Sequence, residues 1–545
     1  MNILLFHGYE LAGSGSNEYN RYLARALLKQ GHTVHIVCRE RHPRAIEFID
    51  QAWFWHTEQN PVRELLHPDA EPACILHRLP DTPFYPVYLT DKQRPGNAIA
   101  FTALSDQQLA SFKRQNEALL DAILTTTKPD ILFANHLVMQ PSIAVKPCRE
   151  HNVPFVIFAH GSAIEYTVRK DKRYLHEAAD ALAHCQALIT GNQEVCDRIL
   201  ALFPEQRHAI EGKHHIVGIG VDTSLFAPVD PGSRRQRLDE FLRSAEGRPQ
   251  GGKSPALLQV LQQSLQRRDF DVLRTQFCDY NENSVDTDIA DKLRRLNPEK
   301  PVILYVGALT AGKGLQSLLC AFPLVFAQLH DPQLMIIGSG AYRETLEALV
   351  YALQHKDEAL LRWLAERGFD LDDSDEHGPW TDILHFLSHR KNLDRLFHHS
   401  HQLADKVFFL GRMRHAQLAW LFPCADIAVF PSIVPEAYGL VLMEALANGV
   451  LPLVSYFSGF KDGIDELERF LPATLVDSMK ISMRPESRLD SIATRLLQLH
   501  QAGSEPGLRN RLAAIAAEHY DWNRRALELS TVLRQVKAGD NIKTR

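Results

Sequence analysis

A repeated alternation of short apolar segments, glycine-bearing loops and helix-like stretches constrains this chain more than any other feature. It begins with an apolar segment at 3–6, a loop that carries Gly13 and Gly15, a helix-like stretch at about 17–30 and a second apolar segment at 34–37. Short strands that alternate with helices predict a parallel sheet with helices on its faces. We therefore expect the chain to begin with a doubly wound α/β domain.

The alternation occurs in two series, which predicts two such domains. A chain of 545 residues is also long for a single hydrophobic core. The further strands expected in the two series are 131–134, 155–158, 187–190 and 215–217 in the first, and 302–307, 334–338, 407–411, 427–431 and 451–455 in the second. We predict Rossmann-like domains at 1–215 and 216–520, with a last helix at about 521–538 that crosses back onto the first domain.

Two segments do not fit a minimal pair of α/β domains. The first, about 228–300, opens with a stretch rich in Pro, Gly, Arg and Gln and contains an apolar-periodic helix near 257–273. The second, about 342–401, is helix-like with an acidic break at 370–376. We interpret both as inserts. Acceptor recognition, oligomerisation and surface decoration are alternative roles for them.

Composition narrows the class of protein. A hydrophobic share of 45% and a charged share of 23% are ordinary for a soluble globular protein. The net charge of -6 gives no general attraction to nucleic acid. The eight cysteines form no C-x-x-C pair, which favours reduced thiols in a cytoplasm. The longest apolar stretch, 438–460, is interrupted by polar residues and Pro, so any membrane contact is expected to be peripheral.

The segment 427–444 carries the strongest chemical signal. Its order indicates a buried strand, a tight loop and the start of a helix. Free N–H groups and the positive dipole end of a starting helix suit a phosphate, and Gly439 would let a ligand approach the backbone closely. Glu436 and Glu444 can accept hydrogen bonds from sugar or ribose hydroxyls. The segment therefore predicts a site for a diphosphate that lies between a sugar and a nucleoside.

This segment resembles the E-x7-E signature of the retaining glycosyltransferases of family 4, including the Pro-Ser pair at 431–432 that precedes it. The resemblance implies the GT-B fold, in which two Rossmann-like domains face each other across a cleft. It also implies transfer of a hexosyl group from a nucleotide-diphosphate sugar with retention of configuration. Glu436 would contact the donor sugar as a catalytic residue and Glu444 the ribose. The remaining donor contacts implied in this segment are Tyr438, Gly439, Leu440 and Val441.

A loop at the start of the second domain supplies positive charge. Residues 306–314 resemble the G-R-L-x-x-x-K-G loop of the family, which implies that Gly307 and Lys313 bind the diphosphate. Lys313 would also be catalytic, because it would stabilise the charge that develops on the leaving nucleotide. Ala308 stands where the family has Arg, and Arg412 or Arg414 is a candidate replacement.

Two motifs of the first domain also match the family. His160 follows the strand 155–158, and the family has a His near the reacting sugar at that place, so we predict that His160 is catalytic. Gly13 and Gly15 match the family's glycine loop and would close over the phosphate and the acceptor. A dinucleotide-binding fingerprint is the alternative. Glu18 disfavours it, because it occupies the third glycine position, where close packing demands a small residue.

A glycosidase and a metal-dependent transferase are two further interpretations. Glycosidase carboxylates lie about 5–9.5 Å apart, whereas Glu436 and Glu444 would be ~12 Å apart along one continuous helix. The D-x-D strings at 286–288 and 373–375 hold metals in another glycosyltransferase fold. Both lie in the inserts, where solvated loops are expected, so we predict no obligatory metal and no other cofactor.

The whole pattern predicts a cytoplasmic hexosyltransferase of cell-envelope or polysaccharide biosynthesis. Its predicted partners are a nucleotide-sugar donor and a sugar, lipid or small-molecule acceptor. The basic run 169–173 would attract an acidic acceptor or an anionic membrane surface at the inner face, and a solvated helix face is the alternative. A catalytically silent GT-B protein that binds nucleotide sugar or scaffolds a glycan-assembly complex is the alternative function, favoured by Ala308 and the inserts.

Overall fold

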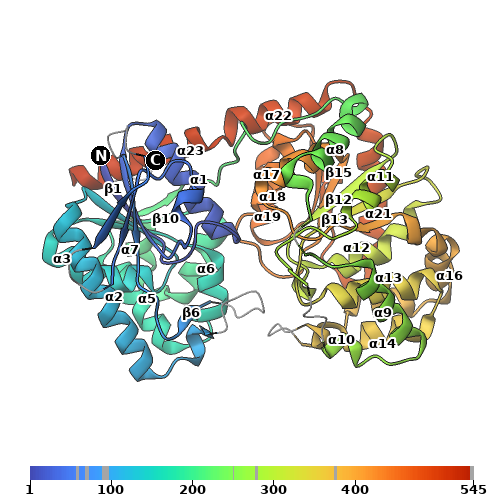
Figure 1. Ribbon diagram of the computed structural model, residues 1–545, viewed down its shortest axis with the longest axis horizontal. Coiled ribbons are helices and arrows are strands. Elements are labelled where there is room, and N and C mark those ends of the chain that lie inside the picture. The colour runs from blue at the N-terminus through green and yellow to red at the C-terminus, as the bar shows by residue number, and fades with distance from the viewer. Residues whose placement is uncertain are drawn as a thin grey trace. The chain divides into compact units, whose positions relative to one another are not determined.

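The computed structural model describes residues 1–56, 61–67, 73–88, 97–249, 251–275, 280–372 and 377–539 (Figure 1). The chain divides into two compact units. Among the described residues, the N-terminal unit comprises those of 1–88, 97–222 and 519–539, and the C-terminal unit those of 223–518. Each unit is built on a mainly parallel sheet with helices on its faces, which confirms the predicted α/β fold class.

The main sheet of the N-terminal unit has the strand order β11-β10-β9-β8-β1-β2-β5-β3-β4. Its neighbouring strands are parallel, except that β3 and β4 are antiparallel. β1 lies between β2 and β8, so the chain leaves it in both directions, and such a switch point is where open α/β sheets bind ligands. The strands of this unit are β1 (Asn2–Phe6), β2 (Thr33–Cys38), β3 (Gln51–Phe54), β4 (Val62–Leu65), β5 (Cys74–Arg78), β8 (Ile131–Asn135), β9 (Phe155–Phe158), β10 (Ala187–Thr190), β11 (His214–Ile216) and the separate pair β6 (Tyr85–Val87) and β7 (Ala98–Ala100).

Helices cover both faces of this sheet, so its central strands are largely apolar and carry polar residues mainly at their ends. Every residue of β8, β9 and β10 is buried, as expected for parallel strands without a solvated face. The helices of this unit are α1 (Gly15–Lys29), α2 (Asp106–Thr127), α3 (Gln140–His151), α4 (Gly161–Ala163), α5 (Lys172–His184), α6 (Gln193–Leu202), α7 (Arg207–Glu211) and α23 (Trp522–Ala538).

The C-terminal unit has a parallel sheet in the order β14-β13-β12-β15-β16-β17. Its switch point is β12, which lies between β13 and β15. The strands are β12 (Val302–Val306), β13 (Gln333–Ile337), β14 (Val407–Phe409), β15 (Ile427–Phe430), β16 (Leu451–Ser455) and β17 (Lys480–Ile481). The helices are α8 (Arg234–Arg243), α9 (Pro255–Gln266), α10 (Val272–Thr275), α11 (Ile289–Arg295), α12 (Leu315–Ala321), α13 (Arg343–Gln354), α14 (Glu358–Arg367), α15 (Thr381–Leu387), α16 (Arg390–His399), α17 (His415–Leu421), α18 (Leu440–Ala447), α19 (Ser458–Leu467), α20 (Ala473–Ser478), α21 (Arg488–Ala502) and α22 (Leu508–His519), which ends in the N-terminal unit.

The predicted helix near 257–273 is wrong in its second half. α9 ends at Gln266, and the chain turns before α10 begins at Val272. Arg268 adopts a left-handed conformation with φ of 61°, which stops the helix although the apolar spacing continues. Apolar periodicity alone does not report such a break.

The insert at 228–300 is anchored by buried ion pairs rather than loosely attached. Lys253 Nζ lies 2.6 Å from carboxylate oxygens of both Glu344 and Glu347 on α13, and all three side chains are at most 4% exposed. Asp286 pairs with Arg343 of α13 at 2.6 Å. Removing one member would strand a buried charge, so this cluster holds the insert firmly against α13.

The prediction of a solvated loop at 286–288 is therefore wrong for Asp286. Its side chain is 1% exposed, and Lys292 is a second partner at 2.6 Å. Burial opposes ionisation of this carboxyl, but the charges of Arg343 and Lys292 prevail and lower its pKa. The second D-x-D string, at 373–375, lies outside the described residues.

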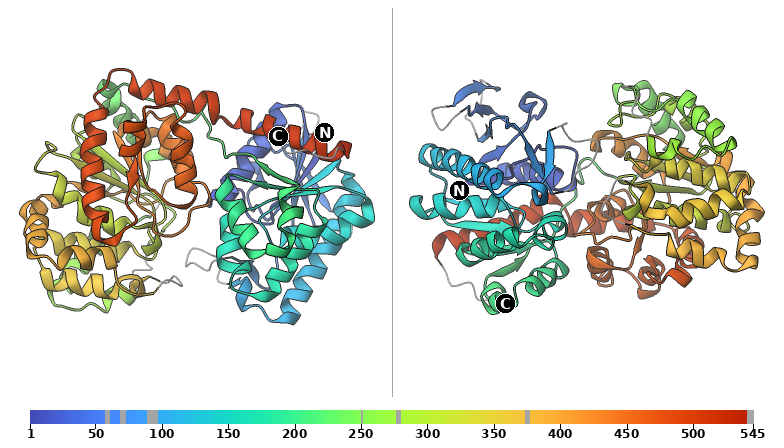
Figure 2. Two further views of the ribbon diagram at one scale, coloured as in Figure 1. Left: turned by 180° about the vertical axis from the view of Figure 1, so that it is seen from behind. Right: turned by 90° about the horizontal axis from the view of Figure 1, so that it is seen from below.

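The last helix, α23, belongs to the N-terminal unit and lies beside α1 (Figures 1 and 2). Trp522 at its start contacts the ring of Tyr19 on α1 edge-on, with centroids 5.4 Å apart. Gly220 faces this Trp so closely that a Cβ would come within 2.6 Å of the indole. In the described ranges, no helix is both long and apolar enough to cross a membrane.

Candidate functional site

The predicted donor residues gather where β12 and β15 lie side by side in the C-terminal unit. β12 leads into Gly307 and then into a 3-10 turn at Ala311–Lys313. β15 leads into the loop 431–439. The Ile433 N–H donates to the carbonyl of Gly312 at 2.9 Å, so the two loops are joined at the switch point of the sheet.

Lys313 and Glu436 form an ion pair across these two loops. Their side chains are 32% and 19% exposed, so solvent can reach both. The carbonyl of Glu436 accepts hydrogen bonds from Ser458 Oγ and from the Gly459 N–H, each at 2.9 Å. Because α19 begins at Ser458, the start of that helix holds the backbone of Glu436 while its carboxylate stays accessible.

Gly439 forms the tight entry to α18. Its φ of +81° is left-handed, and a Cβ there would come within 2.2 Å of the Phe460 ring. Both the backbone conformation and the lack of space therefore require glycine. Leu440 and Val441 are half-buried and open the helix. Their N–H groups belong to the first turn, which lacks intrahelical acceptors.

Glu436 and Glu444 are not on one continuous helix, so that assumption is wrong. α18 begins at Leu440, and Glu436 precedes it in the loop together with the buried Tyr438. Glu444 lies inside the helix and is 5% exposed. The turn at Gly439 therefore separates the surroundings of the two carboxylates, one open and one enclosed.

His415 is a partner of Glu444 that the sequence motifs did not indicate. Its Nε2 lies 2.8 Å from Glu444 Oε1, and its ring contacts Phe226 edge-on with centroids 5.8 Å apart. His415 is the first residue of α17. This contact holds the Glu444 carboxylate in one orientation at the start of a neighbouring helix.

Ala308, at the position of the family's Arg, contacts a tyrosine instead of supplying charge. The Tyr305 hydroxyl donates to the Ala308 carbonyl at 2.8 Å and lies next to Gly307, where a Cβ would be 3.0 Å from it. Burial and the charge of Glu436 raise the pKa of Tyr305, so this phenol remains protonated and can donate. The candidate replacements contact the insert: Arg412 donates to Asn283 at 2.7 Å, and Arg414 pairs with Glu246 at 3.1 Å.

His160 lies in the N-terminal unit within a buried polar cluster at the ends of β1, β8 and β9. Its Nε2 is 3.1 Å from Asn135 Oδ1, which also accepts from Asn20 Nδ2 at 3.0 Å. Asn20 Nδ2 lies 3.1 Å from His7 Nδ1. Burial lowers the pKa of His7 to about 4, and burial together with His7 lowers the pKa of His160 to about 3. Both imidazoles are therefore neutral hydrogen-bonding groups near neutral pH.

The glycine loop is linked to this cluster. Gly13 has φ of +102° and its N–H donates to Glu18 at 3.3 Å, while Gly15 is the first residue of α1. Asn17, in the first turn, lies 2.9 Å from His7 Nε2 through its side-chain oxygen. The loop and His160 thus belong to one hydrogen-bonded group at the switch point of the N-terminal sheet.

Sequence reasoning missed several members of these groups, and a simple signal marks some of them. His7 follows β1 directly, and Asn135 is the last residue of β8. A polar residue at the carboxyl end of a predicted apolar strand is a candidate for the ligand-binding edge. This signal does not apply to Asn20, Tyr305 or His415, because none of them stands at the carboxyl end of a predicted strand.

The remaining predicted features have structural partners. In the basic run, Arg169 pairs with Glu165 at 2.8 Å and Arg173 with Asp171 at 2.7 Å. The run joins the end of one helical stretch to the start of α5, so it is not a single helix face. Among the described residues, no group of three or more His, Cys, Asp or Glu is placed to hold a metal ion.

Two family models match the chain. The model "Glycosyltransferase Family 4" matches residues 13–225, and "Glycosyl transferases group 1" matches 286–363 and 388–481. The unmatched stretches 226–285 and 364–387 fall largely in the two predicted inserts.

The curated relatives match over shorter stretches. An uncharacterized glycosyltransferase of Methanocaldococcus jannaschii is 28% identical over 164 residues, which is 30% of this chain and 29% of that protein. A GDP-mannose-dependent monoacylated alpha-(1-6)-phosphatidylinositol monomannoside mannosyltransferase of Corynebacterium glutamicum is 27% identical over 165 residues, 29% of this chain and 30% of the relative. The matches thus span less than a third of these relatives.

Solved structures match over nearly the whole length. Sucrose-phosphate synthase from Thermosynechococcus elongatus superposes with a TM-score of 0.58 at 17% identity, covering 99% of both chains. The catalytic domain of starch synthase IV from Arabidopsis thaliana, bound to ADP and acarbose, gives 0.53 at 12% identity, covering 98% of this chain and 99% of the other. At such identities these likenesses concern the fold.

Proposed function

Because the chain belongs to the GT-B glycosyltransferases of family 4 type, we propose that it transfers a hexosyl group from a nucleotide-diphosphate sugar to a sugar, lipid or small-molecule acceptor, with retention of configuration. The observation that carries this proposal is the pairing of Lys313 with Glu436 at the switch point of the C-terminal sheet. It brings a cation suited to a diphosphate next to a carboxylate suited to sugar hydroxyls, just before the start of α18.

Each group has a distinct proposed role. Lys313 and the first N–H groups of α18 would stabilise the charge that develops on the diphosphate as the glycosidic bond breaks. Glu436 would exchange its contact with Lys313 for hydrogen bonds to the donor sugar. Glu444, oriented by His415, would accept from the ribose hydroxyls. The backbone at Gly307 and Gly439 would border the phosphates.

His160 would act as a neutral positioning donor or acceptor for the reacting sugar. Its lowered pKa makes an imidazolium general acid unfavourable near neutral pH, whereas a neutral ring already oriented by Asn135 can hold a hydroxyl in place. The Gly13–Gly15 loop would border the phosphate and the acceptor. In this proposal, residues of the C-terminal unit bind the donor, and His160 of the N-terminal unit positions the reacting sugar.

We also propose that transfer requires no obligatory metal, since Lys313 and a helix start would supply the positive charge. Transfer that persists in the presence of EDTA would agree with this, and transfer restored only by a divalent ion would contradict it. We also propose a role in cell-envelope or polysaccharide assembly. A cytoplasmic location is supported by the cysteines, because those described are free thiols buried in the two units.

The test is nucleotide release from UDP-, GDP- and ADP-sugars without acceptor. We expect slow release from one donor, and its loss in Glu436→Ala with folding unchanged. Glu468→Ala is the matched control, because Glu468 is an exposed, ion-paired glutamate of the same unit that lies outside the site. Equal release by wild type and Glu436→Ala would overturn the role assigned to Glu436.

A catalytically silent protein that binds nucleotide sugar, or scaffolds a glycan-assembly complex, is the second candidate. Ala308 favours it, because Arg412 and Arg414, the proposed sources of a second positive charge, contact Asn283 and Glu246. Donor binding by wild type without turnover on any acceptor tested would support this candidate. Turnover would exclude it.

A further inference from the structure

A cavity of about 410 Å³ lies at the carboxyl ends of β2 and β5 in the N-terminal unit, apart from every residue assigned a role above. Three arginines line it: Arg39 and Arg41, which follow β2, and Arg78, the last residue of β5. β2 and β5 are neighbours, with Cys38 opposite Arg78, so the three side chains start from one edge of the sheet. That edge is where α/β sheets bind ligands.

Arg39 is the most unusual of the three. It is only 8% exposed, and in the described part of the chain no carboxylate lies within ion-pair distance of it. Arg39 Nη1 donates a hydrogen bond to the Pro80 carbonyl. Its guanidinium carbon also lies over the Tyr85 ring, 5.9 Å from the ring centroid. A guanidinium has five N–H donors and stays charged, so a buried one with a single acceptor favours an anion beside it.

The other two arginines have carboxylate partners near the surface. Arg41 pairs with Glu10 at 3.2 Å, and Arg78 pairs with Asp81 at 3.0 Å. These carboxylates are 43% and 81% exposed, so their pairs contribute little stability and are easily rearranged. Among the described lining residues there are three guanidinium groups and two carboxylates, so these residues carry an excess of positive charge.

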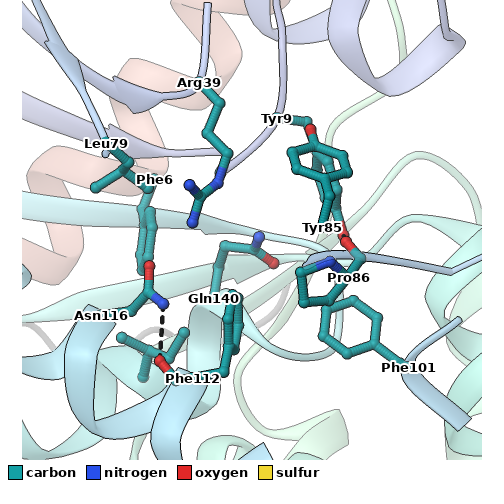
Figure 3. Close-up of a pocket in the computed structure, with 12 residues that line it drawn as sticks. Phe6, Tyr9, Arg39, Leu79, Tyr85, Pro86, Phe101, Phe112, Asn116 and Gln140 are labelled. Atoms are coloured by element: carbon teal, nitrogen blue, oxygen red, sulfur yellow. Dashed lines mark hydrogen bonds between the residues drawn. The ribbon is translucent and has the colours of Figure 1, made fainter. Parts of the chain in front are cut away.

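Arg39 also lines a second, smaller cavity next to the first. This second space holds about 10 Å³, and Figure 3 shows the Arg39 side chain extending toward Gln140 between Leu79 and Tyr9. It has room for about one water, so only the 410 Å³ space can take a larger ligand. Burial lowers the pKa of Arg39 and outweighs the opposing influence of the Asp81 charge.

A run of aromatic rings joins the cavity to the His160 cluster. Tyr85 contacts Tyr9 with centroids 5.9 Å apart, Tyr9 contacts His136 at 5.7 Å, and His136 contacts His160 at 4.7 Å. These ring contacts place the cavity and the His160 cluster in the same part of the N-terminal unit. A substituent of the acceptor could reach the arginines while its hydroxyl lies near His160.

We propose that this cavity binds a phosphate group of the glycosyl acceptor, with Arg39 as the central contact and Arg41 and Arg78 at the rim. The acceptor assignment rests on the proposed function, whereas the anion site itself does not. Phosphate fits better than a carboxylate, because three planar guanidinium groups can engage several oxygens of a tetrahedral anion with paired hydrogen bonds. A sugar phosphate and a phospholipid headgroup both present this chemistry.

The first experiment measures the binding of inorganic phosphate by calorimetry. All titrations use the Lys313→Ala background, which removes the proposed diphosphate contact from the comparison. We expect Arg39→Gln to weaken the phosphate Kd by about 30-fold or more, the scale for truncating one partner of a buried charge pair. Arg41→Gln, at a half-exposed residue whose loss should not affect folding, should weaken it less.

The matched control is Arg44→Gln, because Arg44 is an exposed arginine of the same unit that pairs with Glu64 outside the cavity. Its Kd should equal that of the parent. No binding at millimolar phosphate, or equal binding by parent and Arg39→Gln, would overturn the anion site. An Arg39-dependent Kd would uphold it even if nucleotide release fails and the proposed transfer reaction is wrong.

The second experiment identifies the source of the phosphate. Glucose 6-phosphate is compared with glucose, and phosphatidylglycerol vesicles with phosphatidylcholine vesicles, for parent, Arg39→Gln and Arg44→Gln. Arg39-dependent binding of the sugar phosphate alone indicates a soluble phosphorylated acceptor, and Arg39-dependent binding of the anionic vesicles alone indicates a lipid headgroup. Binding to neither would overturn the assignment to an acceptor.

Discussion

The two units hold polar groups at their switch points in opposite ways. In the N-terminal unit, His7, Asn20, Asn135 and His160 form a buried cluster of neutral groups. In the C-terminal unit, Lys313 and Glu436 are charged, paired and partly exposed. Neutral dipoles can be buried at moderate cost when they satisfy one another, whereas ions need either solvent or several partners. One unit therefore buries neutral polar groups that hold one another in place, whereas the other keeps an ion pair within reach of solvent.

The largest effect on stability is expected at the buried ion pairs of Asp286 in the C-terminal unit. Asp286→Ala should lower the free energy of unfolding by ~3–5 kcal/mol, because Arg343 and Lys292 would lose a shared buried partner. Asp291→Ala, on the exposed pair with Arg294, should cost at most about 1 kcal/mol. Denaturant unfolding of both variants measures the difference. Equal costs would show that exposure does not govern how this unit holds charge.

The largest effect on activity is expected at the accessible pair. Lys313→Ala should lower the transfer rate by ~10²–10³, the scale for removing one group that stabilises developing negative charge. Stability should change little, since the pair is partly exposed. Lys461→Ala, on a surface pair with Asp465, is the control. Unchanged steady-state rates in Lys313→Ala would contradict the proposal that Lys313 stabilises the charge on the leaving diphosphate.

Acid should destabilise the N-terminal cluster before it affects the buried carboxylates. The pKa of His7 falls from 6.5 to about 4 on folding, so between these values the unfolded chain binds a proton that the folded chain does not. Stability then decreases as the pH falls through this window, by on the order of 3 kcal/mol for one such group. His7→Gln should flatten the slope of unfolding free energy against pH from 6.5 to 4. An unchanged slope would contradict a neutral buried His7.

A smaller loss is expected from the neutral cluster itself. Asn135→Ala should lower the free energy of unfolding by ~1–3 kcal/mol, because it leaves His160 and Asn20 without a common acceptor. The matched control is Asn523→Ala, at an exposed residue whose side chain bonds within its own turn. Thermal unfolding compares the two. A cost for Asn135→Ala as large as for Asp286→Ala would remove the distinction between neutral and charged clusters.

Much of the fold could be predicted because parallel strands buried on both faces read as short, largely apolar runs. The predicted strands 187–190 and 451–455 coincide with β10 and β16. β4 was not predicted, because its sequence Val-Arg-Glu-Leu is largely exposed at the edge of the sheet and carries no apolar run. The end of α9 was missed because a single left-handed residue stops it.

The residues of the candidate site could be predicted from the sequence, but the contacts between them could not. Glu436, Glu444 and Lys313 stand out through local motifs, since a helix start, a glycine and a strand end are local features. Lys313 and Glu436 are 123 positions apart, and Glu444 and His415 are 29 apart, so no local pattern reports that they meet. Asp286 illustrates the same limit, because its D-x-D string indicates a loop while its partners on α13 place it in the interior.

The amino-acid sequence by itself determined the two series of buried strands and the main side chains able to carry chemistry, because both depend on local composition and spacing. Only the tertiary structure decided which of these side chains are paired and which are charged. His160 is a neutral group because the N-terminal unit closes around it. Among the described residues, no carboxylate lies within ion-pair distance of Arg39, because the chain beside its guanidinium supplies a carbonyl and a ring instead. Burial and neighbouring charge set these properties, and both arise from segments that are distant in the sequence.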